Sequence, residues 1–396
     1  MIHSEILYEI IENPISGEWG KEGDGINVIR TANFTNEGYI DFTNVVKRNV
    51  DPAKITKKRL FNGDLIIEKS GGSPTQPVGR VVYFNQEGDF ICNNFTSVLR
   101  AKSDLVYPKY LHYILFANHK YGLTNKFQNK TTGIINLQLK RYIKETKIPL
   151  PSLEEQKKIA AILDAADDYR QKTNALIDKY DQLIQGLFLE TFGDPVTNPM
   201  GWDLDILNNV CSKITDGTHD SPPRLDNGVK FITGKHIRPY VIDYENSDYV
   251  DEEIHDIIYK RCNPEFGDVL YTNIGANLGT AAINIVKYEF SMKNVALLKP
   301  MNELITGKYI EFFLNSDNMK EKVLWIGSQG GAQQFLSLTH LRKLIISLPP
   351  ISLQHQFAER VAQIGKQKQQ AEASLVKAVE LFSSLLQRAF KGELTS

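Results

Sequence analysis

Cysteine is scarce in this chain of 396 residues: Cys92, Cys211 and Cys262 are the only three, and no two of them form a CxxC pair. An odd, isolated set excludes a disulfide framework and a thiolate zinc site, and it is typical of a reducing compartment. No run of 18 apolar residues occurs, which excludes a membrane-spanning helix. The first residues, MIHSEILYEIIENP, lack a basic start followed by an apolar stretch, so we expect no secretory signal and a cytoplasmic location.

The motifs of enzymes that act on nucleotides or nucleic acids are also missing. Pro follows Asn in NPIS, NPMG and NPEF, but the second proline of an amino-methyltransferase loop is absent each time. Neither an FxGxG loop for S-adenosylmethionine nor a G-x4-G-K-[ST] loop for a nucleoside triphosphate occurs. In GDLIIEKS, Glu68 and Lys69 are adjacent and point to opposite faces of a strand, so they do not complete a nuclease site with Asp64. We therefore expect no catalytic residue, metal site or cofactor in this chain.

An excess of positive charge is absent as well. The net charge is −1, which taken alone argues against a nucleic-acid ligand. The distribution is uneven, because residues 1–147 carry 20 Lys and Arg against 15 Asp and Glu, whereas residues 196–345 carry 15 against 19. The densest cluster, KRNVDPAKITKKR at 47–59, has six cations and one acid. Such a run is either a solvated face or a set of phosphate contacts.

What the sequence does contain is an internal repeat at an offset of 198 residues, half of the chain. IPLPSLEEQKKIAAILDAA (148–166) matches ISLPPISLQHQFAERVAQI (346–364). Upstream, FNGDLIIEKSGG (61–72) matches EFGDVLYTNIGA (265–276), each an apolar strand entered at a Gly-Asp turn. The amphipathic helix KYLHYILF likewise matches KYIEFFLN.

The repeat predicts an α+β fold made of two mixed α/β domains, 1–151 and 195–349, each followed by a long helix, 152–194 and 350–396. Ser152 and Glu155 form an S-x-x-E capping box at the start of the first helix. Seam positions then alternate in steps of four and three, which is typical of a coiled coil. The apolar seam residues are Ile159, Leu163, Ala166, Ile177, Tyr180, Ile184 and Leu187 in the first helix and Phe357, Val361, Ile364, Leu375, Ala378, Phe382 and Leu385 in the second.

Two cations in these seams favour antiparallel pairing. In a parallel pair Arg170 would face Lys368 in one layer, at a like-charge cost. Antiparallel pairing separates them, so that the stems pack and the charges reach water. It also sets small residues opposite each other, Ala166 with Ala378 and Thr173 with Ala371. We predict an antiparallel coiled coil with pseudo-two-fold symmetry; the alternative is that each helix packs on its own domain.

In this order and spacing the features resemble the DNA specificity (S) subunit of type I restriction–modification enzymes, over the whole chain. The matching segments are the helix entries at 150–156 and 348–354, the helix ends GLFLETFGD (186–194) and LLQRAFKGEL (385–394), and DGTHDSP (216–222). The second entry has Ile-Ser-Leu where the first has Leu-Glu-Glu, so it lacks the capping glutamate. The resemblance implies a subunit without chemistry of its own, in which each domain reads one half of a split, asymmetric DNA sequence and the coiled coil fixes the unread spacer.

The resemblance also implies partners besides double-stranded DNA. Two modification subunits, which hold S-adenosylmethionine and methylate adenine N6, would dock on the helices. Restriction subunits with ATP- and Mg-dependent translocation would join them, and no membrane is involved. We expect docking to use outward helix positions such as Gln156, Tyr169, Leu176 and Phe188.

Affinity for DNA is expected from phosphate contacts and specificity from base edges in the major groove. Loops bounded by glycine and rich in amide, hydroxyl and cationic side chains are the candidates. In the first domain these are Lys69, Ser70, Ser73, Thr75 and Gln76, with Lys126, Gln128, Asn129, Lys130, Thr131 and Thr132 in a second segment. In the second domain they are Thr272, Asn273, Asn277, Ser328, Gln329 and Gln333, with His219, Lys235 and His236 as further candidates. The alternative for each residue is an ordinary polar surface loop.

Two other classes of function stay open at this point. A two-headed coiled-coil scaffold for protein or glycan ligands has the same architecture, and its binding would be insensitive to salt. A self-contained nuclease or methyltransferase is disfavoured by the missing motifs. The residues by themselves support two similar ligand-binding domains without chemistry, and DNA as the ligand rests on the resemblance.

Overall fold

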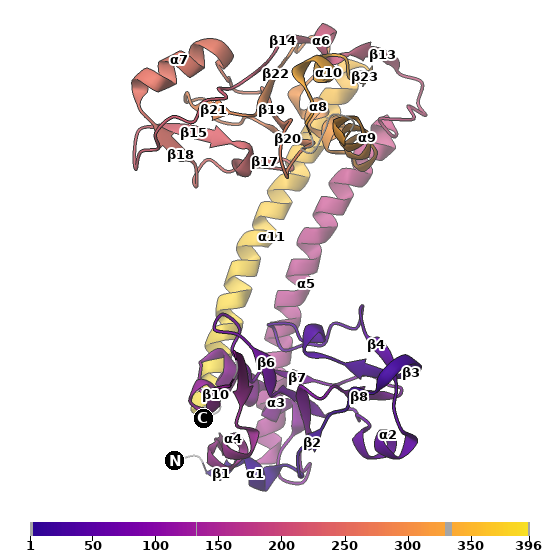
Figure 1. Ribbon diagram of the computed structural model, residues 1–396, viewed down its shortest axis with the longest axis vertical. Helices are drawn as coiled ribbons and strands as arrows, with labels where there is room; N and C mark the ends of the chain where they lie inside the picture. Colours follow the sequence, from indigo (N-terminus) through magenta and orange to yellow (C-terminus); the bar gives the residue numbers. More distant parts are fainter. Residues whose placement is uncertain (1–2, 132, 329–334, 395–396) are drawn as a thin grey trace. The chain divides into compact units, whose positions relative to one another are not determined.

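The computed structural model describes residues 3–131, 133–328 and 335–394. The chain divides into two compact units, Met1–Ala175 with Ala371–Ser396 as unit 1 and Leu176–Gln370 as unit 2 (Figure 1). Each unit contains one mixed α/β domain and part of both long helices, α5 (Leu153–Phe192) and α11 (Ile351–Lys391). The domain boundaries predicted from the sequence stay a prediction.

In the described residues, the domain of unit 1 contains four sheets. Their strand orders are β2-β9-β5-β7 (Ile15–Ser16, Thr96–Leu99, Leu65–Glu68, Val81–Tyr83), β4-β3-β8 (Val46–Asn49, Lys21–Ile29, Phe90–Cys92), β10-β11-β6 (Gln128–Thr131, Ile134–Leu137, Ser70–Gly72) and β1-β12 (Ser4–Ile6, Lys147–Pro149). The helices are α1 (Leu7–Ile10), α2 (Pro52–Lys58), α3 (Pro108–Lys120) and α4 (Leu139–Glu145), with 3-10 turns η1 (Thr31–Asn33) and η2 (Asn125–Phe127).

Within the described residues, the domain of unit 2 repeats three of these four sheets, and β10-β11-β6 has no counterpart that forms a sheet. The sheets of unit 2 have the orders β14-β22-β19-β20 (Cys211–Asp216, Ala296–Pro300, Val269–Thr272, Thr280–Ile283), β18-β15-β21 (Asp248–Val250, Val229–Thr233, Ser291–Lys293), β16-β17 (Ile237–Arg238, Val241–Ile242) and β13-β23 (Asp203–Ile206, Ile345–Leu348). The helices are α6 (Leu207–Val210), α7 (Glu252–Cys262), α8 (Gly307–Asn315), α9 (Asp317–Ser328) and α10 (Leu338–Arg342), with the 3-10 turn η3 (Gly234–His236).

The internal repeat is confirmed by the strand pairing. In both domains a four-stranded sheet lies next to a three-stranded one whose central strand is antiparallel to one neighbour and parallel to the other. The Gly-Asp turns match as well. Asp64 accepts the Phe61 N–H at 2.8 Å and pairs with Arg100, while Asp268 accepts the Glu265 N–H at 2.7 Å and pairs with Lys299. These carboxylates hold the strand entry.

The antiparallel helix pair is also confirmed, within each unit. In unit 1 the first part of α5 lies beside the last part of α11, and the Tyr169 hydroxyl is 2.7 Å from Ser374 Oγ (Figure 1). In unit 2 Lys368 Nζ lies 2.6 Å from the Asp181 carboxylate. The alternative is partly right, because Ile159 and Leu163 belong to the same core as the domain of unit 1. The helices therefore pack on each other and on a domain.

The sequence predicted that the charges of the two seam cations reach water, but in the structure both cations are paired with carboxylates. Arg170 pairs with Asp167 on its own helix at 2.8 Å, and its guanidinium lies 5.4 Å from the centre of the Phe382 ring. Lys368 pairs with Asp181 across the helices. Carboxylates thus compensate both cations inside a partly buried seam.

Gln156 is buried, so the prediction that it points outward is wrong. Its Oε1 accepts the Tyr107 N–H at 2.8 Å, and its Nε2 donates to the carbonyls of Leu105 and Pro151. Gln354 makes the same three bonds in unit 2, with the Thr306 N–H and two carbonyls. This glutamine joins the helix entry to the loop before α3 or α8.

Replacing Gln156 by leucine is expected to lower the free energy of unfolding by about 3 kcal/mol, because one buried N–H and two carbonyls lose their partner. Urea denaturation followed by circular dichroism measures the change. Gln387→Leu, at an exposed position of α11, is the control. Equal stability of the two variants would contradict the bridging role of Gln156.

Phe188 is the second inward residue that was expected to face outward. It is buried in unit 2, with its ring stacked on Phe312 at 5.8 Å and in edge contact with Phe357 at 5.7 Å. Tyr169 and Leu176, by contrast, are exposed. The seam pattern fails at Phe188 because this end of α5 contacts the domain of unit 2 as well as α11.

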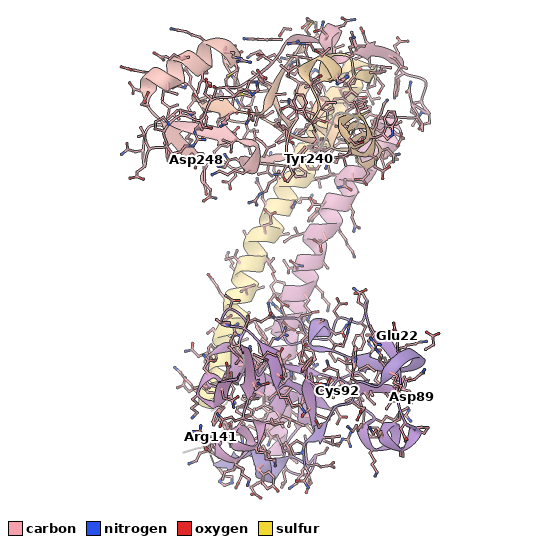
Figure 2. All side chains as sticks on the ribbon, viewed as in Figure 1. Glu22, Asp89, Cys92, Arg141, Tyr240 and Asp248 are labelled. Carbon is pink, nitrogen blue, oxygen red and sulfur yellow. The ribbon has the colours of Figure 1, made fainter. Side chains whose placement is uncertain are left out.

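The three cysteines are free and buried; Cys92 is labelled in Figure 2. Burial raises the pKa of Cys92 and of Cys262 to about 11, so these thiols stay protonated near neutral pH. None of the helices in the described part of the chain is long and apolar enough to cross a membrane.

His112 of α3 is buried among aromatic rings, and its Nδ1 has no hydrogen-bond partner. Burial, together with the nearby Lys109, lowers the pKa of His112 to about 3. The unfolded chain binds a proton at this histidine below pH 6.5 and the folded chain does not. The contribution of neutral His112 to the free energy of unfolding is therefore fully present above pH 6.5 and is lost as the pH falls.

Replacing His112 by methionine is therefore expected to remove part of the acid sensitivity of unit 1. Between pH 6.5 and the folded pKa, each pH unit costs the wild type about 1.4 kcal/mol of unfolding free energy through this histidine. Between pH 7.5 and pH 5, the difference in unfolding free energy between the variant and the wild type should therefore shift by about 2 kcal/mol in favour of the variant. Urea titrations at both pH values measure this, with His3→Gln at an exposed position as control. A pH-independent difference would contradict it.

Candidate nucleic-acid interface

The two candidate segments of the first domain meet in one sheet. Strand β11 pairs with β10 on one side and with β6 on the other, so that Asn136 lies opposite Ser70. The Ser70 hydroxyl donates to Asn136 Oδ1 at 2.5 Å. Residues 66 positions apart in the sequence are thereby placed side by side.

The turn from Ser73 to Gln76 follows directly after β6. The N–H of each of these two residues donates to the carbonyl of the other, at 2.9 and 3.1 Å, which closes a tight turn. Thr75 and Gln76 are exposed at its tip. A short, hydrogen-bonded turn presents a hydroxyl and an amide with little freedom, which is what reading a base edge requires.

The other candidates of the first domain differ in their exposure. Lys69 is half-buried and donates to the Ser16 hydroxyl, and burial lowers its pKa. Gln128 is half-buried and donates to the Val78 carbonyl at 3.0 Å. Lys126 and Asn129 are exposed. Lys130 and Thr131 lie in β10, but their side chains and all of Thr132 fall outside the described residues.

The matching segments of the second domain also come together. The Leu336 N–H donates to the Asn273 carbonyl at 2.9 Å, and Ile274 forms a bridge with Phe335. Ser328 is exposed at the end of α9, while Gln329 and Gln333 fall outside the described residues. Both domains thus bring together the loop after the Gly-Asp strand and a segment from late in the domain.

Three candidates of the second domain are buried, which corrects the expectation that they face a groove. The Thr272 hydroxyl donates to the carbonyls of Asn277 and Thr280. The Asn273 amide donates to the Leu336 carbonyl at 3.2 Å. His236 Nδ1 accepts the Thr233 N–H at 2.9 Å and closes the turn η3. Their polar groups stabilise loops of the domain.

His219, Lys235 and Asn277 are exposed. His219 is 2.8 Å from Asn294 Oδ1 and 3.0 Å from the carboxylate of Asp216. Lys235 pairs at 3.1 Å with Asp248, which is labelled in Figure 2. The parallel strands β15 and β21 end at the residues that precede Gly234 and Asn294, so these groups gather at one edge of the sheet.

Trp325 and Phe335 were missed from the sequence. Both are large exposed side chains, and they flank the end of α9 and the bridge to Ile274. Apolar residues in a polar loop region carry no motif, so the sequence gave no signal for them.

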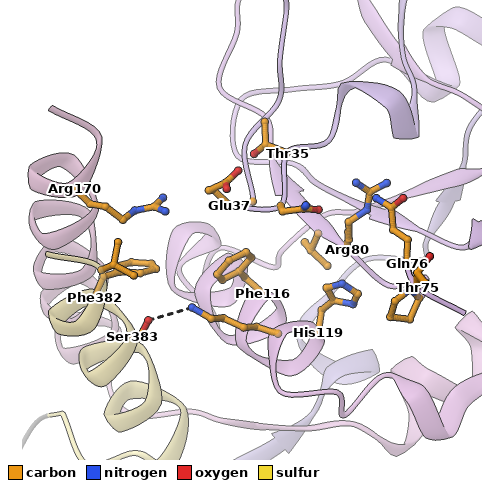
Figure 3. A pocket seen from close by; sticks show the side chains of 16 residues that line it. Thr35, Glu37, Thr75, Gln76, Arg80, Phe116, His119, Arg170, Phe382 and Ser383 are labelled. Carbon is orange, nitrogen blue, oxygen red and sulfur yellow. Dashed lines mark hydrogen bonds between the residues drawn. The ribbon is translucent and has the colours of Figure 1, made fainter. Parts of the chain in front are cut away.

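A hollow of about 650 Å³ lies in unit 1 beside the turn Ser73–Gln76 (Figure 3). Its walls come from the loop after η1, from α3 and from both long helices. Arg80, His119, Lys120 and Arg170 line it, and Glu37 is the carboxylate among the lining residues. Arg80 also makes two bonds to Glu68, at 2.9 and 3.0 Å.

The side chains considered for a nuclease site are therefore engaged elsewhere, Glu68 with Arg80 and Asp64 with Arg100. Among the residues that the structure describes, no three His, Cys, Asp or Glu side chains lie close enough together to hold a metal ion.

The family model described as type I restriction modification DNA specificity domain matches residues 21–179 and 225–380. The chain is 26% identical over 65% of its length to the EcoBI specificity subunit of Escherichia coli, of which the match spans 60%. It is 24% identical over 95% of its length to the putative MjaX specificity subunit of Methanocaldococcus jannaschii, of which the match spans 90%. The solved type I restriction–modification S subunit from M. genitalium aligns with 98% of this chain and 96% of its own, at a TM-score of 0.58 and 17% identity, and so has the same fold.

Proposed function

Because the chain belongs to the type I restriction–modification DNA specificity family, we propose that its two domains read the two halves of one asymmetric DNA sequence. As a specificity subunit it carries no active site of its own. The alternative of a scaffold for protein or glycan ligands has no support from the family. The observation that carries the proposal is the repeated meeting of two polar loop segments at the same place of each domain.

Reading is assigned to the exposed polar side chains of those segments. In the first domain these are Thr75, Gln76 and Asn129, with Lys126 as a phosphate contact. In the second domain Asn277 comes from those segments, and we add the exposed His219 and Lys235, which lie in two other loops of the same domain. The domains differ in these side chains, and this supports two different half-sites.

Docking of the modification subunits is assigned to exposed apolar side chains of α5 in each unit. Ile162 and Tyr169 lie seven residues apart in unit 1, and Leu176 and Leu183 lie seven residues apart in unit 2; all are between 40% and 53% exposed. Regularly spaced apolar side chains on a helix surface are typical of a protein interface. The docked subunits would bring S-adenosylmethionine and methylate adenine N6; restriction subunits would bring ATP- and Mg-dependent translocation, all in the cytoplasm.

The test is co-expression with a modification subunit encoded beside this chain, followed by sequencing of methylated adenines in the host DNA. We expect one split motif with a fixed spacer and one methylated adenine in each half. A well-formed complex that methylates no split motif would contradict the proposed function.

A further inference from the structure

Two cations share one aromatic ring in the hollow of unit 1. The Lys120 ammonium lies 5.9 Å and the Arg170 guanidinium 5.4 Å from the centre of the Phe382 ring. Lys120 comes from the end of α3, Arg170 from α5 and Phe382 from α11. Figure 3 shows Arg170 and Phe382 directed from the helices toward this space.

The charges in the hollow are compensated unequally. Glu68 holds Arg80, and Asp167 holds Arg170. Lys120 donates to the Ser383 hydroxyl at 3.2 Å, and none of the ion pairs found among the described residues includes it. Burial and the nearby Arg170 both lower the pKa of Lys120, because its charge is partly desolvated beside another cation. An anion placed between the two cations would relieve this repulsion.

The same place in unit 2 has no such character. Two equivalent backbone hydrogen bonds allow the loops of the two units to be compared. The Asp41 N–H donates to the Asn33 carbonyl and the Asp243 N–H donates to the His236 carbonyl, each at 2.8 Å. Gly38 and Tyr240 each lie three residues before these aspartates, so they occupy equivalent positions. Both have positive φ, +88° and +68°, but at Gly38 a Cβ would meet the Phe116 ring at 2.9 Å, whereas Tyr240 packs its ring on Phe312.

The smaller hollow of unit 2 is about 170 Å³ and is lined by Asp194 and Asp317. Tyr240, labelled in Figure 2, forms part of its wall. Counting on from the matching helix starts gives Met319 at the position of Lys120, and Met319 belongs to α9 because α8 ends at Asn315. Only the hollow of unit 1, of these two, is therefore suited to an anion.

We infer that the hollow of unit 1 holds a phosphate group of the DNA backbone between Lys120 and Arg170, beside the turn that reads bases. This inference rests on the proposed function and deepens it: the two domains hold DNA unequally, and the first supplies a backbone anchor that the second lacks at the equivalent place. A single phosphate contact carries no sequence information, so it fixes register and not specificity.

The test uses the complete chain assembled with its modification subunits and a duplex that carries the methylated motif. Equilibrium binding is measured over a range of NaCl concentrations. Lys120→Gln is expected to weaken binding about three- to tenfold and to reduce the slope of log K against log salt by about 1, with an unchanged motif. Glu37→Gln, on the opposite wall, is expected to strengthen binding. Arg170 is left intact, because its removal would leave the buried Asp167 unpaired.

Lys140→Gln, at an exposed position of α4, is the matched control. If the wild-type complex methylates its motif but Lys120→Gln and Lys140→Gln have equal salt slopes, the phosphate site is refuted and the proposed function stands. If inorganic phosphate raises the Tm of the wild type more than that of Lys120→Gln while DNA binding is the same in both, the hollow is a free-anion site and the inference is overturned. If the wild-type complex neither binds nor methylates DNA, the proposed function itself fails.

Discussion

Deleting one heptad from each long helix, residues 173–179 of α5 and 365–371 of α11, is expected to end methylation at the original site. The two heptads are opposite each other in the antiparallel pair, so their joint removal preserves the seam. Seven helical residues correspond to about 10 Å, or about three base pairs of DNA. Methylation should move to a motif with the same two halves and a spacer about three base pairs shorter.

The expected fall at the original site is at least about tenfold, because the base contacts of one domain are displaced as a group and each is worth about 1–3 kcal/mol. Sequencing of methylated adenines measures both the motif and its spacer. Asn174→Ala with Asp178→Ala, at exposed positions of the same heptad, preserves the helix length and is the control. Retention of the original spacer after the deletion would show that the helices do not set it.

Replacing Thr75 and Gln76 together by alanine is expected to relax the reading of one half-site and to leave the other half intact. The turn is closed by backbone hydrogen bonds between Ser73 and Gln76, so it should keep its shape without these side chains. Two lost base contacts at about 1–3 kcal/mol each predict a loss of discrimination of roughly a hundredfold.

The readout is the rate of methylation on duplexes that carry single-base changes in each half. Ser103→Ala with Asn62→Ala removes one hydroxyl and one amide from another exposed surface of the same domain and should leave both halves unchanged. A loss spread evenly over both halves would mean that the turn contacts phosphates and reads no bases.

The sequence predicted the repeat, the two long helices and their antiparallel pairing, because these features depend on local patterns. Apolar spacing and the positions of Arg170 and Lys368 were sufficient for the pairing. The outward assignment of Gln156 and Phe188 failed for a physical reason. A seam pattern treats a helix as having one partner, whereas these residues lie where the helix also contacts a domain.

For the candidate site, too, some features were predictable from the sequence and others were not. Glycine-bounded polar loops were recognisable, but only the structure shows that the two candidate loops of each domain come together. Which of their side chains face solvent was not predictable. The polar groups of Thr272, Asn273 and His236 are engaged in hydrogen bonds to backbone groups of their own domain. The partner of Asn273 is distant in the sequence. The bonds of Thr272 and His236 depend on the geometry of the local turn.

The sequence by itself thus determined a duplicated protein with two similar domains and an antiparallel helix pair, since periodicity and charge act over a few residues along the chain. The tertiary structure decided which polar groups are free and where cations gather. Lys120, Arg170 and Phe382 lie on three separate helices, and only folding brings them to one hollow. Charge compensation depends on the distances between side chains in space, and the spacing of residues along the sequence does not give those distances.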